Sequence, residues 1–436
     1  MTRLTSEVLV VGGGAAGLSA ALAASAGAKT TLVDDNPHLG GQIWRSEMGK
    51  IKSPDAKRLV DAVKAGIIEI LNDAAVFAAA GPNVLLAETP KGSIELEFRK
   101  LIIASGARER FLPFPGWTLP NVFGAGGLQA LVKGGLPVAD KRIVVAGTGP
   151  LLLAVADYLK AKGAKIVAIA EQAPASKISK FALSLWRSPS KIAQGVALRY
   201  RLLGVPYLTD CWVTSAESGN DLIADAPSQN PPLQKPARSK GVTPSLKAIT
   251  LTRHGEEWVI ECDMLACGFH LVPNLELPSI LGCKIDNDAV SVDEFQQTSV
   301  ENIYCAGEPT GIGGLESSLI EGKVAGLASI GEKEAARSFF RQRDKARRFG
   351  NALNTAFALR DELKTLAEPE TIVCRCEDVP YKALAKFANF RDAKLQTRCG
   401  MGPCQGRVCG AATEFLFGWG HPNVRPPIFP VKMEDL

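Results

Sequence analysis

The sequence predicts an α/β protein with two doubly wound parallel-sheet units and a small helical domain at its C-terminal end. Two observations predict the sheet units: a strand, a glycine-rich turn and a helix open the chain, and the same order returns near residue 142. A third predicts the last domain, since five of the ten cysteines fall between Cys374 and Cys409. The length agrees, because 436 residues suffice for about three domains.

Composition and charge exclude several classes of protein. Hydrophobic residues make up 46% of the chain and charged residues 22%, which is typical of folded globular proteins and excludes a disordered chain. The net charge of +5 is too small over this length to indicate a partner nucleic acid. No run of about 18 apolar residues occurs, so we expect no transmembrane segment and a cytoplasmic location. Cysteines in that compartment are reduced or bind metal.

The first unit begins with a strand over residues 7–11, a turn with three glycines and an alanine-rich helix. In a Rossmann-like fold, Gly12 allows the tight turn, Gly14 lets the backbone approach a pyrophosphate, and Gly17 lets the helix pack on the strand. Asp34 ends the next strand, where its carboxylate can bind the hydroxyl groups of a ribose. These four residues predict a dinucleotide site.

The second unit repeats the pattern with a weaker motif. Gly147 and Gly149 follow the strand 142–146, but Leu152 stands where the third glycine is expected. Glu171 ends the following strand and suits a ribose diol, which favours NAD or another adenine nucleotide over NADP. A vestigial unit that binds nothing explains the missing glycine equally well. The sequence leaves both explanations open.

Further motifs appear in the order typical of two-domain flavoproteins. Gly40-Gly41-Gln42 follows the first unit, a strand ends at Ser105-Gly106-Ala107, and Ala306-Gly307-Glu308 comes late in the chain. Residues 1–335 therefore resemble flavoproteins of the disulfide-reductase type. The resemblance implies FAD in the first unit, with Glu308 on the ribityl chain, and it implies that the cofactor is also contacted by Gly41, Gln42, Gly106 and Gly307. No Cys-x-x-Cys occurs, so thiol exchange at the flavin has no residues to carry it.

The cysteine-rich end carries soft ligands at unusual spacing. Cys374-x-Cys376 is followed by Cys399, Cys404 and Cys409. Four thiolates suffice for a two-iron cluster, and the intervening glycines can bring N–H donors close to it. A structural zinc site normally uses ligand pairs about two to four residues apart, which this spacing fits less well. Reduced cysteines without metal are the third explanation.

Two segments of this end resemble a known domain. Residues 371–378 and 397–409 are similar to the two-iron two-sulfur (2Fe-2S) domain of bacterioferritin-associated ferredoxin. The resemblance implies Cys374, Cys376, Cys404 and Cys409 as ligands. Cys399 is then a near neighbour, and it could replace one of the four.

These observations predict a division of the chain. The FAD-binding domain takes residues 1–115 and 266–332, interrupted by an NAD-binding-like domain over 116–265. A helical linker follows over 333–369, then the 2Fe-2S domain over 370–425 and a tail over 426–436. A proline-rich stretch over 228–245 is expected to be an exposed excursion.

The whole chain resembles the dinucleotide-binding subunit of heteromeric flavoprotein dehydrogenases that act on secondary amines. That family includes opine oxidase, D-hydroxyproline dehydrogenase and hydrogen cyanide synthase. The resemblance implies an electron-transfer subunit whose partner, similar to D-amino acid oxidase, oxidises the amine. It leaves open an FMN at an interface between subunits and a small third subunit.

Two other functions stay possible on the sequence. The chain could be a self-sufficient NADH-dependent reductase of the ferredoxin or rubredoxin type, or a redox-inert scaffold that uses the cluster structurally. No residue can be named as a general base, so the catalytic residues are unknown from sequence.

Overall fold

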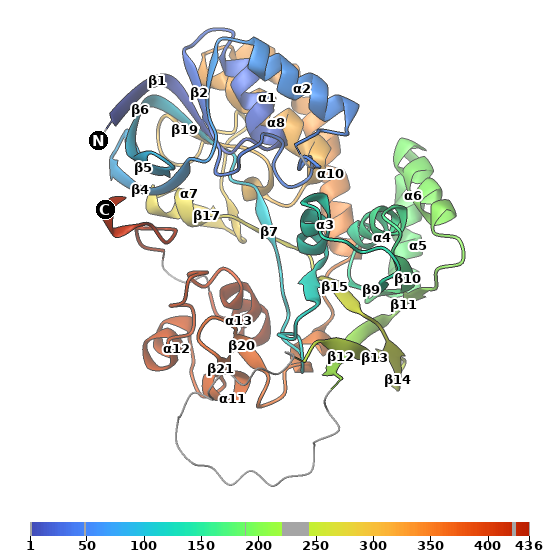
Figure 1. Ribbon diagram of the computed structural model, residues 1–436. Coiled ribbons are helices and arrows are strands. Elements are labelled where there is room, and N and C mark those ends of the chain that lie inside the picture. The colour runs from blue at the N-terminus through green and yellow to red at the C-terminus, as the bar shows by residue number, and fades with distance from the viewer. Residues whose placement is uncertain (1, 48, 188, 220–243, 421–423, 436) are drawn as a thin grey trace.

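A computed structural model describes residues 2–47, 49–187, 189–219, 244–420 and 424–435 (Figure 1). It contains two sheets with covering helices and a helical region rich in cysteine, which confirms the predicted fold class. The second sheet is parallel, whereas the first is mixed, because β4, β5 and β6 pair antiparallel and its other strand pairs are parallel. Most of the proline-rich stretch, 228–243, lies outside the described residues. Within the part described, no helix has both the length and the apolarity needed to cross a bilayer.

The first sheet has seven strands in the order β3-β2-β1-β6-β5-β4, and β19 pairs with β6. Strand β19 comes two hundred residues after β6 in sequence, so the first sheet is completed only after the second has been built. Small residues of α1 and α8 bury against each other on one face of this sheet. Its elements are β1 (Thr2–Val11), α1 (Ala15–Ala24), β2 (Thr30–Val33), α2 (Pro54–Ala65), β3 (Ile68–Leu71), β4 (Ala75–Gly81), β5 (Val84–Thr89), β6 (Gly92–Ile103), β19 (Ile303–Cys305) and α8 (Gly314–Ser329).

The second sheet has five parallel strands in the order β11-β10-β9-β15-β8. The antiparallel sheet β12-β13-β14 lies beside it (Figure 1). The elements of this second unit, the antiparallel sheet included, are β8 (Val122–Gly124), α3 (Ala125–Lys133), β9 (Arg142–Gly147), α4 (Leu151–Ala161), β10 (Lys165–Glu171), α5 (Ala175–Ser184), η1 (Leu185–Arg187), α6 (Pro189–Arg201), β11 (Tyr207–Thr209), β12 (Cys211–Ser218), β13 (Leu246–Arg253), β14 (Glu256–Glu261) and β15 (Met264–Gly268).

Short elements connect the two sheets. Strand β7 pairs with β16 where the chain leaves the first sheet and later returns to it. These connecting elements are β7 (Ala107–Glu109), β16 (Leu271–Pro273), α7 (Glu276–Ile280), β17 (Ile285–Asp286), β18 (Ala289–Val290) and η2 (Glu308–Thr310).

The remaining chain runs from the first sheet to the cysteine-rich region. Helix α10 packs on α8 and on α5, so the linker is in contact with both sheet units (Figure 1). The last residues return to the first sheet, where the N–H of Ile428 donates to the carbonyl of Phe77 at 2.8 Å. These elements are α9 (Lys333–Arg337), α10 (Phe340–Ala356), η3 (Asp361–Thr365), β20 (Ile372–Cys374), β21 (Val379–Pro380), α11 (Tyr381–Leu384), α12 (Phe390–Thr397), α13 (Cys409–Phe417) and η4 (Met433–Asp435). The domain boundaries given above stay predictions.

Candidate functional site

The first glycine turn has three glycines with three different surroundings. A Cβ on Gly17 would lie 1.7 Å from the carbonyl oxygen of Gly12, so only glycine lets α1 approach the turn this closely. Gly12 has a φ of +112°, and a Cβ there would lie 2.2 Å from the carbonyl oxygen of Ala104. Gly14 is half-buried, and a Cβ there would make only an ordinary van der Waals contact, 3.9 Å from the Cα of Gly41. This less crowded position is where a pyrophosphate is expected to approach.

Asp34 lies at the end of β2 beside this turn and is 6% exposed. Its carboxylate accepts hydrogen bonds from the N–H of Gly13 and, at 2.8 Å, from the N–H of Asn36. The loop with Gly41 closes over the turn, because the N–H of Gly40 donates to the carbonyl of Gly13 at 2.8 Å. Gln42 follows in this loop with an exposed side chain. The structure thus brings the predicted ribose and flavin-loop residues to one turn.

Glu308 lies between β19 and α8 and points back to the helix. Its carboxylate accepts hydrogen bonds from the N–H of Gly314 at 2.9 Å and of Gly313 at 3.2 Å. Burial raises the pKa of Glu308 to about 7, even though these two N–H groups act in the opposite direction. The predicted ribityl contact therefore sits at the positive end of α8, and its role toward a cofactor stays a prediction.

The raised pKa of Glu308 predicts how the stability of the chain depends on pH. Because its pKa is higher in the folded than in the unfolded chain, its contribution is largest below about pH 4.5 and is lost as pH rises through about 7. We expect the thermal midpoint of the full chain to fall between pH 5 and pH 8. We expect the free energy of unfolding of the Glu308→Gln variant to fall by roughly 2 kcal/mol less than that of the wild type between pH 5 and pH 8.

Burial raises the pKa of Glu171 as it does that of Glu308. We therefore expect Glu171→Gln to reduce the pH dependence of stability in the same direction, and this variant is the matched comparison. The prediction fails if Glu308→Gln keeps the full pH dependence. Calorimetric scans at constant ionic strength measure it.

Sequence reasoning missed a buried ion pair behind Glu308. Glu321 of α8 is 3% exposed and accepts hydrogen bonds from the N–H of Gly307 at 3.0 Å and from the guanidinium of Arg347 at 2.8 Å. Arg347 belongs to α10, so this pair joins the linker to the end of β19. In the sequence, the only signal for this ion pair is a carboxylate within a helical segment of small residues.

The second glycine turn is crowded at its first glycine, as the first turn is. Gly147 has a φ of +134°, and a Cβ there would lie 2.0 Å from the carbonyl oxygen of Gly268. Leu152, in place of the third glycine, is fully buried. Glu171 is also fully buried, and its carboxylate accepts hydrogen bonds from the N–H of Gly149 at 2.7 Å and of Ala173 at 2.8 Å. Burial raises the pKa of Glu171 to about 7. No oxygen of this carboxylate is left without a hydrogen-bond donor.

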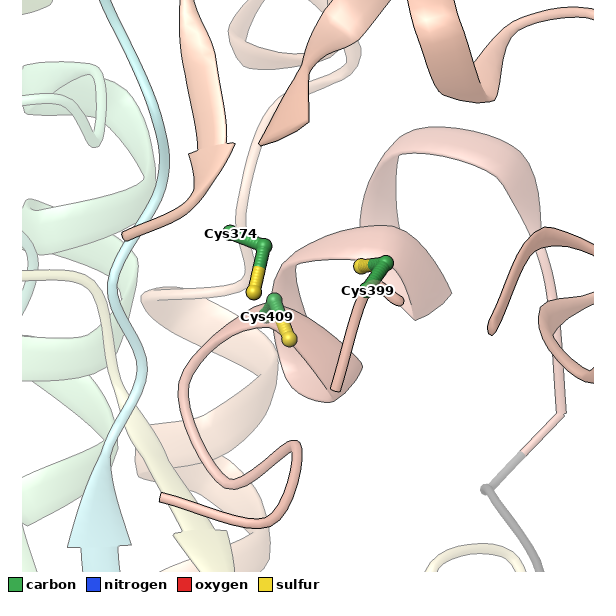
Figure 2. A group of neighbouring side chains, drawn as sticks. All are labelled: Cys374, Cys399 and Cys409. Atoms are coloured by element: carbon green, nitrogen blue, oxygen red, sulfur yellow. The ribbon is translucent and has the colours of Figure 1, made fainter. Parts of the chain in front are cut away.

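The C-terminal region gathers its five cysteines in one place. The sulfur atoms of Cys374, Cys399 and Cys409 lie within 4.8 Å of one another, and all three residues are buried (Figure 2). Cys374 ends β20 and Cys409 is the first residue of α13. Cys376 and Cys404 form the adjoining pair, since each side chain shifts the pKa of the other.

Backbone N–H groups surround these sulfur atoms. The thiol groups of Cys399 and Cys409 lower the pKa of Cys374, and the backbone N–H groups of Gly400 and Glu377 act in the same direction. Cys404 has its pKa lowered to about 5, first by the thiol of Cys409. Donors of this kind stabilise thiolates, so the donor set fits a thiolate-bound iron centre.

Glycine is required beside one predicted ligand. A Cβ on Gly402 would lie 2.2 Å from the Cβ of Cys376, so the loop can pass this cysteine only without a side chain. The structure brings predicted ligands Cys374 and Cys409 together with Cys399, and places Cys376 and Cys404 next to them. Which four of the five bind iron stays a prediction.

An ion-pair cluster connects the cysteine loop to the first unit. Arg108 of β7 pairs with Glu276 at 2.8 Å, and Arg407 of the loop 404–409 pairs with the same carboxylate at 3.7 Å. Arg108 also donates to the carbonyl of Arg407 at 3.2 Å. It follows Gly106 by two residues, and the nearby Asn274 donates its N–H to the carbonyl of Gly106 at 3.0 Å. We call Arg108, Glu276 and Arg407 the arginine clamp.

Comparison with known proteins gives three findings. The family model described as pyridine nucleotide-disulphide oxidoreductase matches residues 6–325. The chain is 28% identical to the HcnB subunit of hydrogen cyanide synthase from Pseudomonas protegens, over 92% of this chain and 89% of that protein. It is 29% identical to the A subunit of opine oxidase from Rhizobium meliloti, over 99% of this chain and 87% of that protein.

Solved structures share the fold at low identity. The crystal structure of L-proline dehydrogenase from P. horikoshii superposes with a TM-score of 0.68 at 18% identity, over all of this chain and 80% of that one. Thioredoxin reductase from T. acidophilum superposes with a TM-score of 0.55 at 21% identity, over 76% of this chain and 99% of that one. Likeness at this level shows the architecture alone.

Proposed function

This chain belongs to the pyridine nucleotide-disulphide oxidoreductase family, and from that premise we propose that it is the electron-transfer subunit of a heteromeric amine dehydrogenase. The family implies FAD, which would be held by Gly12, Gly14, Gly17 and Asp34. An iron–sulfur centre would be held by the cysteines of the C-terminal region. When bound, a flavin takes up two electrons together, and a two-iron cluster passes them one at a time.

The arginine clamp is the observation that carries the proposal. Ala104, which touches the first glycine turn, is four residues before Arg108, and Arg407 lies between Cys404 and Cys409. The clamp therefore holds the cysteine loop against the strand that leaves the predicted flavin site. The two arginine side chains are 23% and 15% exposed, so their charges are poorly solvated and depend on Glu276.

The relatives support the division of labour. HcnB and the opine oxidase chain are both named as subunits of larger enzymes, and both match nearly the whole of this chain. The thiol pair of a disulfide reductase is missing, so electrons from a flavin have no dithiol to reduce. We infer that a flavoprotein partner oxidises a secondary amine, such as an opine or hydroxyproline, and that this chain receives the electrons.

The test is purification from the native host followed by an amine assay. We expect the copurifying complex to contain a second flavoprotein subunit and to reduce a dye with an opine or a proline as donor. The isolated chain, loaded with FAD and iron, should show no amine oxidation. Amine oxidation by the isolated chain at the rate of the complex would defeat the proposal.

The clamp gives a more specific prediction. Glu276→Gln leaves two poorly solvated guanidinium groups facing each other, which pushes the cysteine loop away from β7. We expect electron transfer from reduced flavin to the iron centre to become several-fold slower, with unchanged FAD and iron content. Anaerobic stopped-flow absorbance after photoreduction of the flavin measures this rate.

The matched control is Glu261→Gln, which breaks the ion pair of Glu261 with Arg142. The carboxylate of Glu261 is 79% exposed. That substitution should leave the rate unchanged, because exposed ion pairs contribute little. Equal rates in wild type and Glu276→Gln would show that the clamp does not position the cysteine loop.

A further inference from the structure

The linker after α10 lies across the second glycine turn. The carbonyl of Phe357 accepts a hydrogen bond from the hydroxyl of Thr148 at 3.0 Å. The carbonyl of Ala358 accepts another from the side-chain amide of Gln172 at 3.1 Å. Arg360 donates to the carbonyl of Gln172 at 3.3 Å. The linker is thus bonded both to the turn and to the residue that follows Glu171.

An apolar contact holds the same segment in place. Phe357 is 4% exposed and packs with Ala173 and Ala356. Phe181 of α5 meets the ring of Phe357 edge-on at 5.5 Å between centroids, and it also contacts Phe349 at 6.0 Å. Edge-on aromatic pairs of this kind are favourable, so these contacts stabilise the segment around Phe357 in a buried apolar cluster.

The two glycine turns differ in burial at the position where a pyrophosphate approaches. In the first turn, Gly14 is only half-buried, and the Cα of Gly41 lies 3.9 Å from the place of its Cβ. In the second turn, Gly149 is buried, and the ring of Phe357 lies 4.0 Å from the place of its Cβ. Pro150 follows and has no N–H, so α4 also lacks one of the donors that bind phosphate at a helix start.

Helix α10 also contacts helices of both sheet units. It lies beside α8 and extends toward α5 (Figure 1). A Cβ on Gly350 would lie 3.0 Å from the Cα of Gly313, and Asn354 donates to the carbonyl of Ile312 at 2.9 Å. Gly313 is one of the residues that bind the carboxylate of Glu308. The linker therefore touches both the predicted flavin site and the second turn.

We propose that the linker occupies the place of a nicotinamide nucleotide in the second unit, so that this unit takes no dinucleotide. The residues present do not fit the second nucleotide that the family implies. The covering segment belongs to this chain, so the inference goes beyond the proposed function and holds whatever the partner oxidises. It removes NADH as a direct electron donor and thereby disfavours the self-sufficient reductase.

The experiment is a titration of the full chain, saturated with FAD so that the first site is filled. We expect NADH fluorescence to show no saturable binding to the wild type up to about 1 mM, which corresponds to roughly −4 kcal/mol. The variant Phe357→Ala with Arg360→Ala loosens the linker, and we expect it to bind NADH at least about tenfold more tightly. Phe357→Leu keeps an apolar side chain over the turn and should behave as the wild type does.

Iron content and the thermal midpoint establish that each variant is folded. Saturable NADH binding by the wild type would overturn the inference. So would a folded double variant that still binds no NADH, because the linker would then not be what excludes it. Should the double variant not fold, amide hydrogen exchange of residues 353–360 in the wild type decides, since faster exchange with excess NADH would mean that the nucleotide displaces the linker.

Discussion

Replacing Cys409 by serine is expected to remove the iron centre from the purified protein. Cys409 is 1% exposed, starts α13, and shares the sulfur cluster with Cys374 (Figure 2). A serine hydroxyl is a hard ligand that stays protonated at neutral pH, so it cannot replace a thiolate toward iron. We expect iron to fall from about two atoms per chain to under about a tenth of that, with loss of the visible absorbance.

The same substitution elsewhere in the cluster assigns the ligands. Cys374→Ser, Cys376→Ser and Cys404→Ser should also lose iron, whereas Cys399→Ser should keep it. Cys283→Ser is the control outside the cluster, because its sulfur lies 3.6 Å from the hydroxyl of Thr298 and serine can make that bond. Loss of iron in Cys399→Ser, with iron retained in Cys376→Ser, would make Cys399 the fourth ligand.

Alanine at the first glycine turn is expected to separate folding from cofactor binding. Gly17→Ala places a methyl group 1.7 Å from the carbonyl oxygen of Gly12, so α1 has to move. Overpacking of this kind costs about 1–3 kcal/mol, and we expect a lower thermal midpoint together with loss of FAD. Gly14→Ala makes only an ordinary van der Waals contact, 3.9 Å from the Cα of Gly41, at a φ of −78° that alanine adopts easily, and should cost under about 1 kcal/mol.

Gly14→Ala is nevertheless expected to weaken FAD binding by at least about tenfold, because its methyl group stands where the pyrophosphate would approach. Calorimetric titration of the FAD-free chain and thermal scans measure the two effects. The iron content reports on the C-terminal region and should be unchanged in both variants. If Gly14→Ala binds FAD as tightly as the wild type, the phosphates do not lie at this turn.

Much of the fold was predictable because its signals are local. A strand, a turn with glycines at positions 12, 14 and 17, and a helix follow one another within about twenty residues, so periodicity and glycine positions indicate them directly. The repeat at Gly147 and the return of the first sheet near residue 303 were visible for the same reason. The crowding of five cysteines likewise predicted a cluster of sulfur atoms, and those of Cys374, Cys399 and Cys409 lie together.

Other features could not be predicted because they depend on segments far apart in sequence. Phe357 lies 209 residues from Thr148, and Arg407 lies 299 residues from Arg108. Glu171 suits a ribose by its place in the sequence, which left a nucleotide site and an empty unit both open. No local pattern indicates that the linker is bonded to the adjacent residues Thr148 and Gln172. The proximity of Cys399 to Cys374 and Cys409 depends in the same way on how α12 and α13 pack.

The sequence alone determined the kind of chemistry, since glycine turns and clustered thiols have the same local geometry wherever the chain places them. Only the tertiary structure decided which of the two turns is open and which is covered by the chain's own linker. It also decided that Glu276 joins the cysteine loop to the strand after the predicted flavin site. The physical reason is that turns are set by backbone conformation over a few residues, whereas access to them is set by the packing of side chains from distant segments.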